Sequence, residues 1–214
     1  MGGVKREVVV RSLDKIRIFI AIELASEIRE ELVAVQDKLK KYRADVRWVE
    51  PNKLHLTLKF LGYISASQLK NVFKATAKAV ERISPFPLSF SGLGAFPELD
   101  NPRVIWTGVK EGKGILSRIN RSLEGTLKRN GFPPVCLSGT GRAEKREYHP
   151  HLTLGRVKSS KNKAGLIESV KSELGCSTGL MEVQKVTVLQ SLLKAEGPEY
   201  KPLHVSEIKE LRQD

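Results

Sequence analysis

Short apolar runs alternate along the chain with longer segments in which apolar residues recur every three or four positions. The run at 16–22 is rich in β-branched residues and predicts a buried strand. The segment 27–41 follows Ser26, a candidate N-cap, and its periodic apolar residues predict an amphipathic helix. This mixture of strands and helices predicts an α+β protein.

The same two patterns continue to the end of the chain. Ser65 and Gln68 match a capping box, which marks the start of a helix. The further helices that we expect are 66–83, 115–129 and, after Ser160, 161–174. The further strands that we expect are 46–49, 55–61, 88–90, 103–109, 181–193 and 203–208, with a turn-rich loop at 92–102. No segment has the composition of a linker, so we expect a single domain over 1–214, with residues 1–14 as a flexible N-terminal extension.

The tetrapeptide His-Leu-Thr-Leu occurs twice, at 55–58 and at 151–154. Residues i and i+2 of a strand share a face, so the histidine and threonine of each copy project together while the leucines enter a core. The two histidines lie 96 residues apart (151 − 55), and a helix and further strands are expected after each copy. We therefore expect two related lobes that face each other across a groove.

The chain is strongly basic, with 37 Lys and Arg residues against 24 Asp and Glu residues and a net charge of +13. Such a field attracts polyanions, so we expect RNA or another phosphate-rich ligand as partner. Cys136 and Cys176 show no disulfide framework, which suits a reducing compartment. No apolar stretch approaches the roughly 20 residues that a membrane span needs. We expect a cytoplasmic protein without a membrane partner.

Two opposed imidazoles suit acid–base chemistry on a phosphodiester. One neutral imidazole accepts a proton from the attacking oxygen, and the other, protonated, donates to the leaving oxygen on the opposite side of phosphorus. Thr57 and Thr153 would donate hydrogen bonds to the non-bridging oxygens. His149 forms a His-x-His pair with His151, but no third ligand follows at a zinc-like spacing, so we expect neither a metal nor another cofactor. His204 stands alone and is interpreted as a structural or surface residue.

The residues around both tetrapeptides resemble the paired motifs of the 2H phosphoesterase superfamily, and most closely its RNA 2′,3′-cyclic phosphodiesterase (2′-5′ RNA ligase-like) branch. The resemblance is carried by HLTLKFLG at 55–62, PHLTLGRV at 150–157, RIFIA at 17–21, WVEPNKL at 48–54, GLGAFP at 92–97 and PRVIW at 102–106. It implies a bilobal, LigT-like fold with two pseudo-symmetric antiparallel-sheet lobes, helices outside and a central groove. It also implies hydrolysis of RNA 2′,3′-cyclic phosphate ends to 2′-phosphate, without a metal or cofactor.

The same resemblance assigns roles to the residues of the two motifs. It implies that His55 and His151 are the catalytic pair and that Thr57 and Thr153 contact the phosphate. By resemblance, His55 is expected to be the general acid and His151 the general base, although pseudo-symmetry also allows the reverse assignment.

Family members also use the residue five positions after each motif histidine, which is Phe60 in the first motif and Arg156 in the second. Arg156 ends its strand after a glycine and is expected to reach the phosphate. Phe60 is expected near a nucleobase, but an odd offset places it on the strand face opposite His55 unless the strand bulges. The other candidate RNA contacts are Phe19, Tyr148 and the basic loop residues Arg142, Lys145 and Arg146.

Three alternatives to RNA hydrolysis stay open from the sequence. Ligation to a 2′-5′ linkage would use the same site in reverse. A non-catalytic RNA-binding module would use the same groove, and a small cyclic nucleotide would suit the same two imidazoles. We expect the protein to be a monomer.

Overall fold

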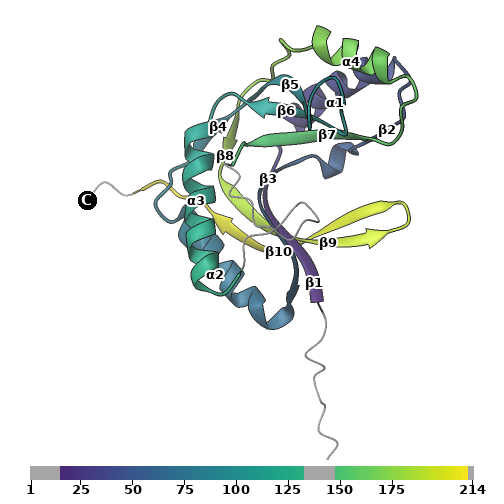
Figure 1. Ribbon diagram of the computed structural model, residues 1–214. Helices are drawn as coiled ribbons and strands as arrows, with labels where there is room; N and C mark the ends of the chain where they lie inside the picture. The colour runs from purple at the N-terminus through teal and green to yellow at the C-terminus, as the bar shows by residue number, and fades with distance from the viewer. Residues whose placement is uncertain (1–14, 133–147, 212–214) are drawn as a thin grey trace, which may run out of the picture.

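The computed structural model describes residues 15–132 and 148–211. Within these ranges the chain forms two four-stranded antiparallel sheets, one two-stranded pair and four α-helices (Figure 1). The predicted α+β class is confirmed. The expected N-terminal extension and the basic loop with Arg142, Lys145 and Arg146 lie outside the described residues, as does Cys136. Cys176 is a free thiol.

Each copy of the repeated tetrapeptide opens a strand of a different sheet. The first sheet has the order β10-β9-β1-β3 and consists of β1 (Lys15–Glu23), β3 (His55–Ser65), β9 (Lys185–Lys194) and β10 (Gly197–Glu207). The second has the order β2-β7-β6-β5 and consists of β2 (Val46–Trp48), β5 (Phe90–Phe96), β6 (Val104–Val109) and β7 (His151–Val157). The strands β4 (Phe86–Leu88) and β8 (Met181–Val183) pair with each other.

The helices cover the two sheets from outside, as expected for two lobes. In the first lobe, α2 (Leu69–Val80) and α3 (Lys113–Arg129) pack on each other, α2 against β9 and β10 and α3 against β3. In the second lobe, α1 (Ser26–Lys40) and α4 (Lys163–Ser172) contact each other, and α4 contacts β5. Figure 1 shows α2 and α3 as one layer, well separated from α1 and α4. No helix within the described ranges is long and apolar enough to cross a membrane.

The repeated motifs show the predicted alternation between a buried and a less buried strand face. Leu56, Leu58, Leu152 and Leu154 are buried, whereas the histidine and threonine of each copy are only half-buried. Burying such leucine side chains contributes about 1.5–3 kcal/mol each to folding. The leucines therefore anchor each motif strand and leave its polar residues on the face turned away from the core.

Each motif strand bulges at the last leucine of its tetrapeptide. In the β1–β3 register, Thr57 lies opposite Ala21 and Lys59 lies opposite Ile20, so Leu58 is an extra residue. In the β6–β7 register, Thr153 lies opposite Trp106 and the next pair is Gly155 with Ile105, so Leu154 is the extra residue there. One extra residue reverses the alternation of side chains along the strand.

The bulges place the two odd-offset residues on the histidine faces of their sheets. Phe60 lies opposite Phe19 on β1, and Arg156 lies opposite Val104 on β6. Phe60 packs with Phe19 and Leu189, on the face away from the main core. The bulge that Phe60 required is therefore present, and regular strand periodicity alone would have placed its side chain in the core.

A buried carboxamide binds the backbone carbonyl of each extra leucine. Asn120 on α3 donates its Nδ2 hydrogen to the Leu58 oxygen at 2.8 Å. Gln36 on α1 donates its Nε2 hydrogen to the Leu154 oxygen at 2.8 Å and to the Val49 oxygen at 2.9 Å. The Leu154 carbonyl also accepts from the Val49 backbone N–H at 2.9 Å, so Gln36 adds a second donor there. Both carboxamides thus supply side-chain donors to backbone carbonyls at the irregular positions.

Several expected element boundaries at helix starts were wrong. The residue at the N-cap of α1 is Ala25, and Ser26 is the first helical residue and makes no capping bond. The last helix starts at Lys163 after Asn162, rather than after Ser160. The predicted capping box is confirmed, because the Ser65 backbone N–H donates to Gln68 Oε1 at 2.9 Å.

Three strand boundaries also differ from expectation. β3 continues past Gly62 to Ser65, with a second register shift at Leu61. The expected loop at 92–102 is strand up to Phe96, because Gly92 adopts φ +74 at a bulge and lets β5 continue. The expected strand at 181–193 is divided between β8 and β9, and β10 starts at Gly197 rather than at 203.

Replacing either buried carboxamide should destabilise the protein. Asn120→Leu removes the side-chain donor of the buried Leu58 carbonyl, and Gln36→Leu removes two hydrogen bonds to backbone carbonyls, so the free energy of unfolding should fall by about 1–3 kcal/mol in each variant. Equilibrium urea unfolding measures this change. The control is Asp37→Asn, which removes an exposed ion pair with Lys40 and should cost less than about 1 kcal/mol. Unchanged stability in both leucine variants would contradict the assigned role.

Candidate active site

A backbone hydrogen bond fixes the His55 ring at the start of β3. The Nδ1 atom lies 2.7 Å from the carbonyl oxygen of Lys53, the last residue of a short 3₁₀ turn (Pro51–Lys53). A carbonyl only accepts hydrogen bonds, so Nδ1 carries the proton. Nε2 is therefore the nitrogen that is unprotonated in the neutral ring and can accept or release a proton.

The His151 ring is held in the same way at the start of β7. Its Nδ1 atom lies 2.7 Å from the carbonyl oxygen of His149, again two residues earlier. Both rings therefore have the same tautomer and present Nε2 as the exchangeable nitrogen. The two motifs repeat a local geometry as well as a sequence.

Two aromatic rings contact each histidine. Around His55, the ring centroids of Phe19 and Tyr200 lie at 4.8 Å and 5.1 Å. Around His151, the ring centroids of Phe96 and Trp106 lie at 4.9 Å and 6.0 Å. Each site thus places its imidazole beside two aromatic rings that also contact one another.

Burial lowers the pKa of both imidazoles below the ordinary value of histidine. At His55 this effect is opposed by the Lys53 carbonyl and by the negative charge of Glu23, which lies directly opposite on β1. At His151 it is opposed by the His149 carbonyl, but positive charge on His149 and Arg156 lowers the pKa further. The two rings therefore have matching hydrogen bonds and opposite electrostatic surroundings.

Thr57 and Thr153 lie on the histidine faces of their strands, as predicted. Their register partners are Ala21 on β1 and Trp106 on β6. Among the described residues, no side-chain hydrogen-bond partner is found for either hydroxyl, and both residues are half-buried. A threonine hydroxyl can donate one hydrogen bond, so both residues suit contact with a ligand on this face.

Tyr148 links the two motifs directly. Its hydroxyl donates to the Thr57 carbonyl oxygen at 3.0 Å, although Tyr148 itself stands three residues before His151. Burial raises the pKa of this hydroxyl, so it is a stable hydrogen-bond donor. Strands β3 and β7 also contact each other, and the two lobes meet where the motifs begin.

Positive charge from both lobes converges on Tyr200, which lies beside His55. Burial raises the pKa of the Tyr200 hydroxyl, and the charges of Arg17, Arg156, Lys53 and Arg47 act against that rise. Arg17 and Lys53 belong to the first lobe and its entry turn, whereas Arg47 and Arg156 stand side by side on β2 and β7. The position between the lobes is thus favourable for an anion.

Phe60 and Arg17 form a platform farther along the first sheet. The guanidinium carbon of Arg17 lies 4.6 Å from the Phe60 ring centroid, and its Nη1 donates to Ser191 Oγ at 2.7 Å. Phe19 lies between this pair and His55. A planar guanidinium above an aromatic ring is suited to stacking with a nucleobase.

A small cavity of about 90 Å³ lies beside His55, with Glu23, Arg29 and Tyr200 among its lining residues. Glu23 is held there by Thr187, whose Oγ1 donates to its Oε2 at 2.9 Å. Within the described residues, no three His, Cys, Asp or Glu side chains are grouped so that they could hold a metal ion.

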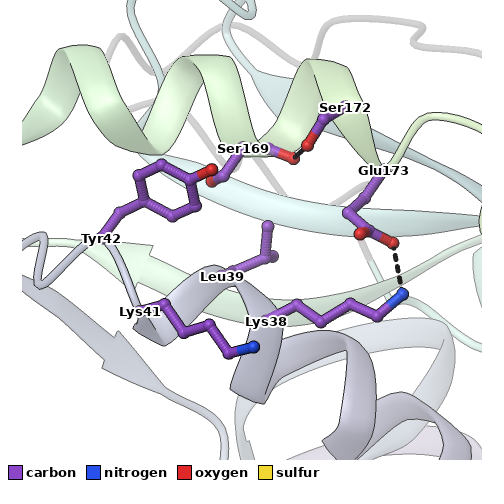
Figure 2. Close-up of a pocket in the computed structure, with 7 residues that line it drawn as sticks. All are labelled: Lys38, Leu39, Lys41, Tyr42, Ser169, Ser172 and Glu173. Carbon is purple, nitrogen blue, oxygen red and sulfur yellow. Dashed lines mark hydrogen bonds and ion pairs between the residues drawn. The ribbon is translucent and has the colours of Figure 1, made fainter.

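A larger hollow of about 270 Å³ lies between α1 and α4, away from both histidines (Figure 2). Its polar groups largely satisfy one another, because Lys38 Nζ pairs with Glu173 at 2.9 Å and Ser172 Oγ donates to the Ser169 carbonyl at 2.9 Å. Neither motif histidine nor motif threonine lines this hollow. His204 also lies outside the site, where its ring stacks on Phe73 of α2 at 4.6 Å.

Several groove residues could not be selected from the sequence, namely Arg17, Glu23, Arg47, Lys53, Phe96, Trp106 and Tyr200. Strand pairing brings these residues to a motif histidine or to its neighbours, except Lys53, which lies in the 3₁₀ turn two residues before His55. One local signal existed for Trp106. A Cβ atom on Gly94, its register partner, would lie 2.2 Å from the indole ring, so the GLG sequence of β5 leaves room for a large ring.

Comparison with known proteins identifies related sequences over most of the chain. The model of the family described as LigT like Phosphoesterase matches residues 22–106. The chain is 35% identical to the RNA 2′,3′-cyclic phosphodiesterase of Methanothermobacter thermautotrophicus, over 89% of this chain and 98% of the relative. It is 37% identical to the protein of the same name from Archaeoglobus fulgidus, over 89% of this chain and 99% of the relative.

The fold is similar to solved structures as well. The crystal structure of E. coli LigT complexed with 3′-AMP matches with a TM-score of 0.68 and 25% identity, over 92% of this chain and 100% of the other. The implied bilobal phosphoesterase fold is thereby confirmed.

Proton titration of the two imidazoles should show the opposite surroundings of the rings. In NMR titrations of the free protein, both pKa values should lie below 6.5, because burial disfavours the charged ring. Glu23→Gln removes a negative charge that favours the imidazolium, so the pKa of His55 should fall further while that of His151 stays unchanged. Glu30→Gln, an exposed change of the same charge, is the control. A rise in the pKa of His55 in Glu23→Gln would contradict this assignment.

Proposed function

Because the chain belongs to the LigT-like phosphoesterase family, we propose that it is an RNA 2′,3′-cyclic phosphodiesterase that hydrolyses 2′,3′-cyclic phosphate ends to 2′-phosphate. The curated relatives that match the chain over nearly their whole length carry this activity in their names. The duplicated geometry of the motifs supports it most directly. Each lobe supplies one imidazole with an exchangeable Nε2 and one threonine hydroxyl on the same strand face.

Hydrolysis proceeds by in-line attack of water on the cyclic phosphorus. A neutral imidazole removes a proton from the water as the new P–O bond forms. The bond between phosphorus and the ribose 3′ oxygen breaks, and the second, protonated imidazole donates its proton to that oxygen. The product is a 2′-phosphate and a 3′-hydroxyl, and the two rings have exchanged protonation states. No step requires a metal ion.

The charges around the two rings favour His55 as the general acid and His151 as the general base. Glu23 lies opposite His55 and stabilises its protonated form, whereas Arg156 and His149 favour the neutral form of His151. A phosphate anion in the groove further stabilises the imidazolium. The acid is thus the ring with a carboxylate neighbour, and the base is the ring with cationic neighbours.

The remaining groove residues bind and orient the substrate. Thr57 and Thr153 donate hydrogen bonds to the non-bridging oxygens, where negative charge accumulates in the transition state. Arg156 adds a charge-assisted contact to the phosphate. The rings of Phe60 and Phe19 provide a stacking surface for the terminal nucleobase. E. coli LigT has been crystallised with 3′-AMP, a ligand that contains both a phosphate and a nucleobase.

We also propose that the protein acts as a monomer in the cytoplasm. One chain supplies both imidazoles, both hydroxyls and the basic residues of the groove, so a second subunit is not needed to complete the site. The high positive charge suits the RNA-rich cytoplasm.

Removing either motif imidazole should abolish most of the activity. His55→Ala and His151→Ala should each lower kcat by about 10²–10⁴-fold, because each ring performs one of the two proton transfers. The assay follows an oligonucleotide with a 2′,3′-cyclic phosphate end in the presence of EDTA. His204→Ala, which changes a histidine outside the groove, is the control and should retain activity.

The terminal chemistry of the product separates the candidate reactions. A 2′-phosphate end supports the proposed hydrolysis. A 2′-5′ linkage to an added 5′-hydroxyl RNA would instead show ligation in the same site. RNA binding without any opening of the cyclic phosphate would contradict an enzymatic role.

A sulfur substitution should distinguish the general acid from the general base. When the 3′ oxygen of the cyclic phosphate is replaced by sulfur, the leaving thiolate needs little protonation. On this substrate, the rate of His55→Ala should therefore approach the wild-type rate, whereas the rate of His151→Ala should stay far below it. Rescue of His151→Ala alone would reverse the assignment of the two histidines.

A further inference from the structure

The two helix layers of the molecule carry very different charge. The segments α2 and α3, which cover the first sheet, contain eight basic residues and one acidic residue. The segments α1 and α4, which cover the second sheet, contain five of each. The two helices α2 and α3 thus carry a net charge of +7 (8 − 1), against zero for α1 and α4, and we call their exposed side the basic layer.

A row of cations, slightly inclined to the helix axis, runs along the exposed side of α2. Lys70, Lys74 and Lys78 recur every four residues and are exposed, and Arg82 continues the row just after the helix. Successive members are separated by about 6 Å along the axis. Like charges at this spacing destabilise a helix. Within the described ranges none of the four has an ion-pair partner, so nothing there offsets that cost.

The cations of α3 extend the row into a broad surface. Arg118, Arg121, Lys128 and Arg129 are exposed, and the single acid of the helix, Glu124, pairs with Lys59 of β3. The acid therefore attaches α3 to the sheet and does not neutralise the cations that face solvent.

The basic layer lies directly behind the strand that carries His55. α3 packs against β3 through the Asn120 contact and the pair between Glu124 and Lys59. β3 is an edge strand of the first sheet, so no further strand of that sheet separates the groove from α3 on this side (Figure 1). A chain that leaves the groove past β3 would therefore reach α3 first and α2 next.

We propose that the basic layer of α2 and α3 binds the phosphate backbone of the RNA whose cyclic phosphate end occupies the groove. This inference rests on the proposed function and specifies its substrate class: an RNA long enough to pass around β3, rather than a mononucleotide. Backbone contacts of this kind need regularly placed cations and no base-specific geometry.

The surface chemistry favours RNA over an anionic membrane. Helices that bind membrane surfaces combine basic residues with large apolar residues that enter the acyl region. In the described residues, the exposed large apolar side chains are Tyr42, Tyr63, Phe96, Leu174, Leu180, Leu193, Val205 and Leu211, and none of them lies on α2 or α3. The basic layer is therefore purely electrostatic.

The test compares two triple variants of equal charge on two substrates. The first variant is Lys70→Gln, Lys74→Gln, Lys78→Gln in the basic layer. The matched control is Lys41→Gln, Lys158→Gln, Lys161→Gln, three exposed lysines of the second lobe. Both variants lower the net charge by three, so any general effect of net charge on the rate of encounter with RNA is the same in the two variants. The substrates are a single-stranded RNA of some tens of nucleotides with a 2′,3′-cyclic phosphate end and a nucleoside 2′,3′-cyclic phosphate.

The basic-layer variant should raise KM for the long RNA about tenfold while kcat stays unchanged. The slope of log KM against log salt concentration should fall by about 2, close to 0.7 for each lost phosphate contact. Activity on the nucleoside 2′,3′-cyclic phosphate should stay unchanged, and the control should behave like wild type on both substrates.

Three results would overturn the proposal. One is an equal change of KM for the long RNA in the basic-layer variant and the control variant. Another is an equal loss of activity of the basic-layer variant on the long RNA and on the nucleoside 2′,3′-cyclic phosphate. The third is loss of binding to anionic vesicles in the basic-layer variant while RNA affinity is retained. Failure of the proposed function is recognised separately, because wild type would then leave the small cyclic phosphate intact. Fluorescence anisotropy with 3′-hydroxyl RNA would still report whether the basic layer binds RNA.

Discussion

The bulge at the last leucine of each His-Leu-Thr-Leu copy is the constraint on which the candidate site depends. Without the extra residue, a strand that presents histidine and threonine to the groove must turn the residue five positions after the histidine into the core. The bulges at Leu58 and Leu154 bring Phe60 and Arg156 back to the groove. In both lobes a buried carboxamide from the covering helix binds the carbonyl of that leucine. The helices therefore help to determine which side chains can meet a ligand.

The hydrogen bond from each Nδ1 to the carbonyl two residues earlier makes the two imidazoles equivalent in tautomer and in attachment. Differences in the pKa of the two rings must then come from other neighbouring groups. Glu23 lies opposite one ring, and Arg156 and His149 lie near the other. Pseudo-symmetry supplies two similar proton carriers, and a few charged side chains assign them different tasks.

Much of the fold was predictable because local sequence decides it. The alternation around Leu56 and Leu152 predicted which face each motif strand buries, and the capping box at Ser65 predicted a helix start. The neighbours of the histidines were not predictable in the same way, since Tyr200 reaches His55 only through the pairing of β10 with β9 and of β9 with β1. Composition likewise predicted an anionic partner, whereas the location of the charge depends on the packing of α2 against α3.

The order of strands in the two sheets also bears on how the protein is made. All strands of the second sheet have been synthesised once the chain reaches Val157, whereas the first sheet needs β9 and β10 from its C-terminal part. Until those strands leave the ribosome, one edge of β1 lacks its partner and the apolar residues that β9 will cover remain exposed. The lobe that carries His55 is thus completed after the lobe that carries His151, and the surroundings of His55 are complete only once β9 and β10 have been synthesised.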